Sequence, residues 1–381
     1  MAILIRNAYV FAPKELGATD VLMVGEKILA VGPNLSVSLP GLSVIDASGF
    51  LLVPGFVDPH VHVLGGGGVG GPITRAPAIT AGELIRAGIT TVVGVLGADV
   101  MTRKLPDLLA KVRELNALGL SAWMYTSSFR YPPVTLSQSV ADDVALVSEV
   151  LGAKLAMGDA NGSFPSTEAV LGLLSQIRQA AVTVKKQGLL HVHLGAIPNP
   201  FDIFEEIAAT GFPIGRHLRP THCARTEFLL KSACAYAMQE SDRYIDITTD
   251  GPCYLGHPAA AVSAAVSCGV PVEQITLSSD GHGVVPRFDA DGNIVGQAVG
   301  EVARNQATMV ELVRDYNFPL SAALSLITAD SLGLSDQGRL EIGACANAVL
   351  LNQNLQIVAV VSRGQVAMHG DTLAVKEPFS E

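Results

Sequence analysis

The chain has 381 residues, of which 49% are hydrophobic and 16% are charged. This composition predicts a large buried core and excludes a mostly disordered chain. The formal net charge of -10 argues against nucleic acid and membranes as partners, because the surface offers too few cations to neutralise phosphates.

Short apolar runs separated by turn residues lie at both ends of the chain. Within residues 1–53, the break at Gly25-Glu26-Lys27 between two alternating runs is typical of a β-hairpin. The strand-rich pattern returns over residues 336–381. We therefore expect residues 1–53 and 336–381 to form one small β-sandwich domain from both chain ends.

Between these ends, residues 54–335 alternate strand-like and helical segments. Eight strand-like runs occur, each followed by a connection, which is the count for a (β/α)8 barrel of the TIM type. The main alternative is an open doubly wound sheet, but no G-x-G-x-x-G lies at a strand-to-helix turn. The predicted fold class is α/β, and the eight runs are GFVDPHVHV, ITTVVGVLG, LSAWMYTSSF, AKLAMGD, LLHVHLG, LRPTHCA, YIDITTDG and ITLSSDG.

The five cysteines are odd in number and include no C-x-x-C pair, so we expect reduced cysteines rather than a disulfide framework. The first residues show no secretory signal, and no apolar run reaches the length of a membrane span. These features predict a cytoplasmic protein.

The strongest signal for chemistry is His60-Val61-His62, at the end of the first barrel run. Side chains alternate along a strand, so His60 and His62 share one face, which on a barrel strand can be the interior. An isolated H-x-H pair would favour two structural histidines. The surrounding PGFVDPHVH favours half of a metal site at the mouth of the barrel.

Four further candidates lie at or near the ends of separate strand-like runs, which is how barrel enzymes assemble their sites. Any one of them alone would be an ordinary polar residue, but together they predict a metal centre. They are Lys154, His193, His222 and Asp280.

Lys154 lies in an apolar run, where a cation is costly. Burial and nearby metal charge favour the neutral amine, which can add carbon dioxide to form a carbamate. The two carbamate oxygens could bridge two metal ions. The alternative is a structural ion pair with Asp159 or another acid.

The chain resembles the amidohydrolase superfamily and, within it, the isoaspartyl dipeptidase family. The similar segments cover most of the barrel and include PGFVDPHVHVLGGGG, GPITRAP, GITTVVGVLGAD, SAWMYTS, GAKLA, HLGA, PTHCAR and TLSSDG. The resemblance implies two divalent metal ions, zinc by expectation, and hydrolysis of an amide bond by a metal-bridging hydroxide.

The resemblance also implies a role for each matching residue. His60 and His62 with Asp280 would hold one metal, and His193 with His222 the other. Carbamylated Lys154 would bridge the two metals. Asp280 would also act as the catalytic base and acid.

Substrate contacts are implied less directly. Arg225 would bind a substrate carboxylate, although it also fits a surface arginine at a helix N-terminus. The glycine run Gly65 to Gly68, including Gly67, would approach the substrate or form a flexible loop. His282 is a candidate substrate contact, and His191 is interpreted as a core histidine.

Four positions depart from the family pattern: Val69 replaces a glutamate, Phe129 a tyrosine, Asn161 an arginine and Val284 a serine. A cationic amine without its carboxylate partner is costly to bury. We therefore expect an N-acyl or cyclic amide to be hydrolysed faster than β-aspartyl-leucine, unless Glu301 or Asp289 supplies an acid.

The leading functional hypothesis is a metal-dependent amidohydrolase related to isoaspartyl dipeptidase. The alternatives are an N-acyl-amino-acid deacylase or cyclic-amide hydrolase with the same centre, or a non-catalytic scaffold. The expected partner is a small dipeptide-like amide, and we expect the chain to be a homo-oligomer.

Overall fold

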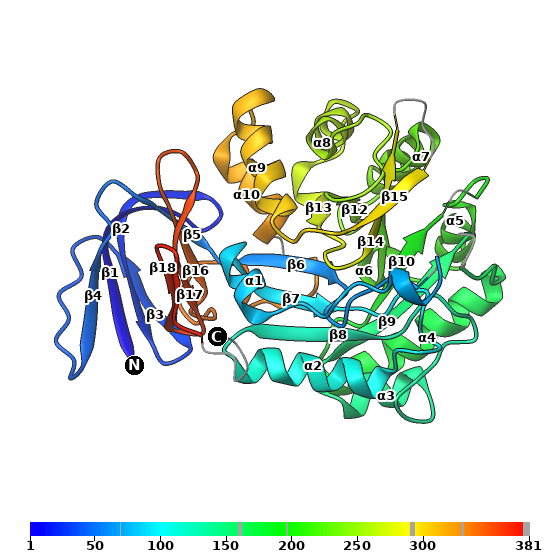
Figure 1. The fold of residues 1–381 in the computed structure, drawn as a ribbon, viewed down its shortest axis with the longest axis horizontal. Coiled ribbons are helices and arrows are strands. Elements are labelled where there is room, and N and C mark those ends of the chain that lie inside the picture. The colour runs from blue at the N-terminus through cyan, green and yellow to red at the C-terminus, as the bar shows by residue number, and fades with distance from the viewer. Residues whose placement is uncertain (69, 159–161, 196, 290–293, 329–330, 376–381) are drawn as a thin grey trace.

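The computed structural model describes residues 1–68, 70–158, 162–195, 197–289, 294–328 and 331–375. Figure 1 shows a small sheet formed by the two ends of the chain beside a larger body of strands and helices. None of the helices in these described ranges has the length and apolarity that crossing a lipid bilayer requires.

The chain ends join in one nine-stranded sheet, in which β5 and β16 connect the N-terminal strands to the C-terminal ones. The hairpin predicted at Gly25-Glu26-Lys27 is confirmed, because β2 and β3 pair antiparallel with Val24 opposite Lys27. Residues from both chain ends share a separate apolar core that includes Ile3, Met23 and Val361. The strands of this sheet are β1 (Ala2–Phe11), β2 (Glu15–Val24), β3 (Lys27–Gly32), β4 (Leu42–Asp46), β5 (Leu51–Pro54), β16 (Ala348–Leu351), β17 (Ile357–Ser362), β18 (Gln365–His369) and β19 (Thr372–Leu373).

The larger body is of the TIM-barrel type, and each of the eight predicted runs overlaps one of its parallel strands, although β9 begins at Val150, before its predicted run. Six strands pair in the order β11-β10-β9-β8-β7-β6, and β12 pairs with β13. The second pair lies beside the ends of the first sheet, with a bridge between Val61 and Gly281. The eight strands are β6 (Phe56–Val61), β7 (Ile89–Gly94), β8 (Ser121–Ser127), β9 (Val150–Met157), β10 (Leu189–Leu194), β11 (Leu218–Thr221), β12 (Ile245–Thr248) and β13 (Ile275–Ser278).

Helices cover the outer side of these strands, so strands such as β6, β7, β9 and β10 are buried along their whole length. Burial on both faces explains their near-continuous apolar sequences. Figure 1 shows α2 and α3 along one side of β8 and β9. The helices are η1 (Pro72–Thr74), α1 (Ala81–Arg86), α2 (Leu105–Ala117), α3 (Val140–Leu146), α4 (Thr167–Val184), α5 (Asp202–Ala209), α6 (Ile214–His217), α7 (Glu227–Ala237), α8 (Pro258–Ser267), η2 (Val272–Gln274), α9 (Arg304–Asp315) and α10 (Leu320–Thr328).

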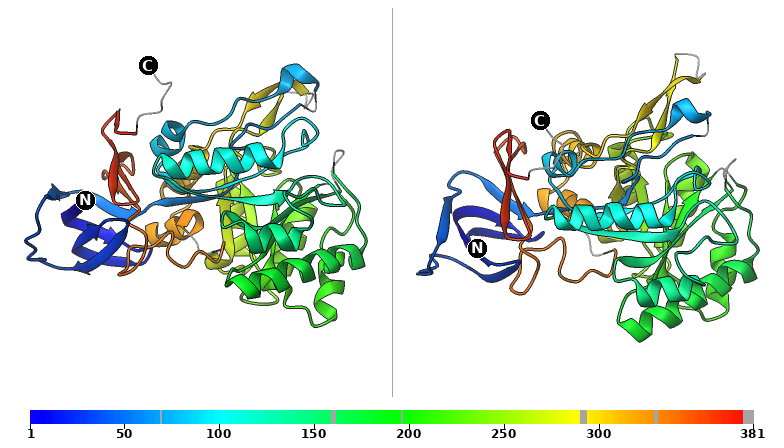
Figure 2. Two further views of the ribbon diagram at one scale, coloured as in Figure 1. Left: turned by 90° about the horizontal axis from the view of Figure 1, so that it is seen from below. Right: turned by 60° about the horizontal axis from the view of Figure 1, so that its bottom comes forward.

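One hairpin was not anticipated from the sequence. Strands β14 (Val284–Phe288) and β15 (Ile294–Val299) pair antiparallel directly after the last barrel strand. Both views in Figure 2 place this hairpin beside the segment that carries η1, and Val284 and Thr74 line one cavity between them. The hairpin therefore adds a wall next to the mouth of the barrel.

Candidate metal centre

The end of β6 carries the first two predicted ligands. His60 lies within the strand and His62 just beyond it, with ring centroids 5.5 Å apart. The carboxylate of Asp58 accepts hydrogen bonds from the His60 backbone N–H at 3.2 Å and from the Ser279 hydroxyl at 2.5 Å. These bonds tie the end of β6 to the segment that follows β13.

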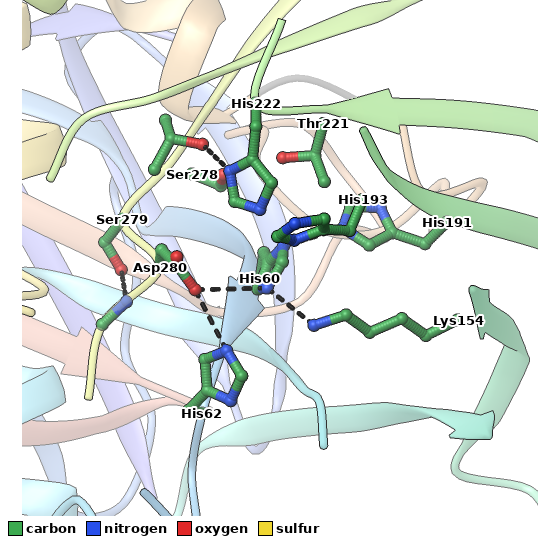
Figure 3. Close-up of polar contacts among 12 residues, drawn as sticks. His60, His62, Lys154, His191, His193, Thr221, His222, Ser278, Ser279 and Asp280 are labelled. Atoms are coloured by element: carbon green, nitrogen blue, oxygen red, sulfur yellow. Dashed lines mark hydrogen bonds and ion pairs between the residues drawn. The ribbon is translucent and has the colours of Figure 1, made fainter. Parts of the chain in front are cut away.

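Asp280 follows β13 and points toward both histidines (Figure 3). Its Oδ1 lies 3.3 Å from His60 Nε2 and 3.1 Å from His62 Nε2. The backbone of Asp280 has a φ of 54°, in the left-handed region that non-glycine residues rarely adopt. The ligand atoms of these three residues lie within 4.8 Å of one another, so they can hold one metal ion.

Lys154 reaches the same place from β9 (Figure 3). Its side chain is fully buried, and its Nζ lies 2.9 Å from His60 Nε2. Burial lowers the pKa of this amine to about 7, despite the opposing effect of the Asp280 carboxylate. Near neutral pH a substantial share of Lys154 is therefore uncharged.

His193 is the next-to-last residue of β10 and His222 follows β11, with ring centroids 4.3 Å apart in an edge-on arrangement. His222 Nδ1 is hydrogen bonded to Thr248 Oγ1 at 2.6 Å. The buried Nε2 of His222 has no hydrogen-bond partner among the residues that the structure describes. The His222 ring centroid lies 5.3 Å from that of His60, which brings this pair next to the first three residues.

The protonation chemistry of the cluster fits a divalent cation. Burial, together with the charges of Lys154 and Arg225, lowers the pKa values of His60 and His222 well below the usual range for histidine. Neutral imidazoles and a carboxylate are the ligand types that zinc takes in proteins. The orphaned Nε2 of His222, aimed into the cluster, is the kind of buried atom that a metal ion would satisfy.

Sequence reasoning missed the part that His191 plays. It is buried as expected, but its Nε2 lies 2.9 Å from His60 Nδ1, so it orients a predicted ligand. Its ring stacks on Tyr125 at a centroid distance of 4.9 Å. The spacing of His191 and His193 places both side chains on one face of their strand, and this was the signal in the sequence that could have revealed the contact. Thr248 was also missed, because its partner His222 lies on a different strand end.

Arg225 and Phe129 lie beside the cluster. Arg225 Nη1 is 3.0 Å from His193 Nε2, and Arg225 lines a cavity of about 230 Å³ together with His222 and Asp280. The Phe129 ring centroid lies 4.6 Å from that of His193 and 5.4 Å from Lys154 Nζ. An arginine next to an open cavity can bind a carboxylate, and a phenyl ring can form an apolar wall but donate no hydrogen bond.

The glycine run packs tightly against the centre. A Cβ on Gly66 would lie 3.1 Å from His62 Nδ1, and one on Gly67 would lie 2.2 Å from the Thr74 carbonyl oxygen. Gly67 also has a φ of 92°, where only glycine is unstrained. Arg103 donates hydrogen bonds to the Gly66 and Ala76 carbonyl oxygens at 2.9 and 2.7 Å, which hold the loop in place.

The structure does not bring His282 into the cavity that Arg225 lines. Its Nδ1 lies 2.9 Å from the Pro77 carbonyl oxygen and its Nε2 lies 3.2 Å from Glu83 Oε1. It lines a different cavity, of about 550 Å³, together with Glu83 and Glu301. A φ of 56° at His282 turns its ring to that side.

The four departures from the family pattern divide into two groups. Phe129 lies beside the cluster, and Val284 lines the cavity with Arg225. Val69 and Asn161 lie outside the described residues.

Residues 51–367 match the model of the amidohydrolase family. A beta-aspartyl dipeptidase from the thermophilic, keratin-degrading Fervidobacterium islandicum AW-1, solved in complex with the beta-Asp-Leu dipeptide, is similar over 100% of both chains. It is 35% identical to this chain and has a TM-score of 0.91.

More distant similarities concern smaller parts or the fold alone. A dihydropyrimidinase from Brevibacillus agri NCHU1002 is 16% identical over 98% of this chain and 96% of its own, with a TM-score of 0.71, which shows a shared fold. A dihydroorotase from Staphylococcus epidermidis is 29% identical over 190 residues, which make up 49% of this chain. The match spans 41% of that relative's length.

Proposed function

The chain belongs to the amidohydrolase family and, within it, to the beta-aspartyl dipeptidases, and on that premise we propose that it hydrolyses the amide bond of β-aspartyl dipeptides. The observation that carries the proposal is the convergence of His60, His62 and Asp280, whose ligand atoms lie within 4.8 Å of one another. The similar dipeptidase was solved with beta-Asp-Leu, which makes that dipeptide the first substrate to test.

We propose that the centre holds two divalent ions, zinc by preference for imidazole and carboxylate ligands. His60, His62 and Asp280 would bind one ion, and His193 and His222 the other. When bound, such a metal pair supplies an acidified water molecule as nucleophile and polarises the amide carbonyl.

Lys154 would connect the two halves as a carbamate. Its neutral nitrogen attacks carbon dioxide, loses one proton and becomes an anion with two oxygens. The lowered pKa of the amine, about 7, supports this reaction, because a protonated amine has no lone pair to donate. The contact of 2.9 Å with His60 supports a place within the centre rather than a separate structural ion pair.

Asp280 would move the proton. Burial raises its pKa, but the His62 contact and the charges of Lys154 and Arg225 outweigh burial and hold it below 3.8. The side chain is therefore a carboxylate at neutral pH, able to accept a proton from the attacking water and return it to the leaving amine nitrogen. Arg225 would bind a substrate carboxylate, and Phe129 would form an apolar wall.

We also propose that the barrel is closed and that the chain ends form a β-sandwich. A closed (β/α)8 barrel over residues 54–335 is supported by the Val61 to Gly281 bridge between the two parallel sheets. A β-sandwich domain over residues 1–53 and 336–381 is supported by the shared core of the chain ends.

The alternatives have weaker support. Cyclic-amide hydrolysis and N-acyl-amino-acid hydrolysis were favoured by four departures from the family pattern. Phe129 and Val284 lie at the site, whereas Val69 and Asn161 lie outside the described residues. The dihydroorotase match covers less than half of this chain, and the dihydropyrimidinase shares the fold at 16% identity. A scaffold without activity would not require a buried, partly neutral lysine such as Lys154 at the cluster.

The test combines metal analysis with turnover. The purified chain, loaded with zinc in the presence of bicarbonate, is expected to retain close to two metal ions and to release leucine from β-aspartyl-leucine. α-Aspartyl-leucine and the chelator-treated protein serve as controls. Intact-mass measurement under native conditions should show an added carbon dioxide that Lys154→Met lacks. A chain that holds two metals yet leaves β-aspartyl-leucine intact would contradict the proposed substrate.

A further inference from the structure

An acidic residue that the sequence analysis did not single out faces the predicted active site. Asp250 lies two residues after β12 and lines the same cavity of about 230 Å³ as Arg225, Asp280 and His222. Arg225 and His222 follow β11, Asp250 follows β12 and Asp280 follows β13, so the cavity collects the ends of three neighbouring strands. Such positions carry substrate-binding groups in barrel enzymes.

One oxygen of Asp250 is fixed and the other is available. Oδ2 accepts a hydrogen bond from the Glu301 backbone N–H at 2.7 Å. The side chain makes no other hydrogen bond or ion pair to the residues that the structure describes. The residue is half-buried, which holds the carboxylate in one orientation while leaving part of it accessible from the cavity.

The charges around Asp250 favour an incoming cation. Partial burial raises its pKa, and so do the neighbouring carboxylates of Glu301 and Asp280. Arg304 lowers the pKa in part but forms its own ion pair with Glu301 at 3.3 Å. A substrate ammonium would supply the positive charge that this carboxylate lacks.

Glu301 and Asp289, the two acids first considered as partners for a substrate amine, are less well placed than Asp250. Glu301 lines the neighbouring cavity, beside His282 and Glu83. Asp289 follows β14 on the exposed part of the hairpin and does not line the cavity of Arg225. Asp250 is the acid that shares a wall with both Arg225 and the predicted base Asp280.

We propose that Asp250 binds the α-ammonium of the substrate's aspartyl residue, opposite a carboxylate held by Arg225, so that the site selects β-aspartyl dipeptides with a free amine. This inference rests on the proposed function and names the substrate feature that the site requires. It reverses the expectation drawn from Val69, which named Glu301 and Asp289, but not Asp250, as acids that could replace the missing glutamate.

The test compares β-aspartyl-leucine with its N-acetyl derivative, which lacks the ammonium but keeps both carboxylates. We expect the zinc-loaded protein to favour the free amine in kcat/KM by about tenfold or more, the scale of one charged contact in a pocket. Asp250→Asn keeps an acceptor for the Glu301 N–H and removes only the charge. In this variant the preference should fall close to one, mainly through a higher KM for the free amine.

Glu301→Gln is the matched control, because it removes a neighbouring negative charge from a different cavity. It should retain the wild-type preference. The proposal is overturned if the wild-type protein favours the acetylated compound, or if Asp250→Asn keeps the preference for the amine.

Calorimetric binding separates this inference from the proposed function. If neither compound is hydrolysed, the proposed function fails, and binding of the two compounds then decides about Asp250. Tighter binding of the free amine that Asp250→Asn abolishes supports the inference, and equal binding of the two compounds overturns it.

Discussion

Replacing Thr248 with valine should weaken metal binding without touching a predicted ligand. Thr248 Oγ1 lies 2.6 Å from His222 Nδ1, and His222 Nε2 is the buried atom left for a metal. When Nε2 binds a metal, Nδ1 carries the ring proton and donates it to the threonine hydroxyl. Valine has the same shape but no acceptor, so the variant leaves a buried N–H without a partner.

The expected loss of metal affinity follows from removing the hydrogen bond between Thr248 and His222. Losing the partner of a metal-binding histidine typically costs 10–100-fold in metal affinity, or about 1.4–2.8 kcal/mol. An unsatisfied buried donor costs about 1–3 kcal/mol, which agrees with this range. Thr248→Ser retains the hydroxyl and is the control.

Competition between the metal-free protein and a chromophoric chelator measures the two zinc affinities. We expect the weaker-bound zinc to be released at lower chelator concentration in Thr248→Val, and close to the wild-type concentration in Thr248→Ser. Unchanged affinities in Thr248→Val would refute the argument, as would an equal loss in the serine variant.

Three further predictions concern residues at or near the centre. Asp280→Asn should lower kcat by about 10²–10⁴-fold, the usual contribution of a general acid–base group, and a loss below tenfold in a stopped turnover assay would contradict the role of Asp280. Lys154→Met, which places an uncharged side chain of similar length in the buried strand, should bind fewer than two metals by elemental analysis while its circular dichroism spectrum is retained. Burial raises the pKa of Asp246 to about 6, although hydroxyls of Ser278 and Thr221 oppose the shift. The folded metal-free protein therefore binds this proton more tightly than the unfolded chain, and the resulting stability, up to about 3 kcal/mol, is present below pH 4 and lost as the pH rises through 6. Urea unfolding of Asp246→Asn should show a smaller decline between pH 4 and 7, and an identical decline would show that other groups cause it.

The barrel strands and the residues that converge on the candidate centre could be predicted from local patterns. A strand buried on both faces, such as β6 or β9, is a short apolar run, and a polar residue within it is conspicuous. Alternation of side chains placed His60 and His62 together, because the period of a strand is the same wherever the strand lies. For the same reason Lys154 stood out in an apolar run as a group that burial would tend to neutralise.

The surroundings of these positions depend on contacts between segments that are distant along the chain. Asp250 shares a cavity with Arg225 and Asp280 because the ends of separate strands meet at one face, and no local pattern encodes which loop side chains will meet there. His282 follows Asp280 by two residues, yet a positive φ turns its ring toward Glu83 and away from that cavity. Backbone rotations of this kind, and the pairing of β5 with β16, are selected by the packing of the whole chain rather than by the residues next to them. Spacing along a strand could therefore predict residues that are able to hold a metal, whereas the groups that would recognise the substrate come together only through the folded barrel.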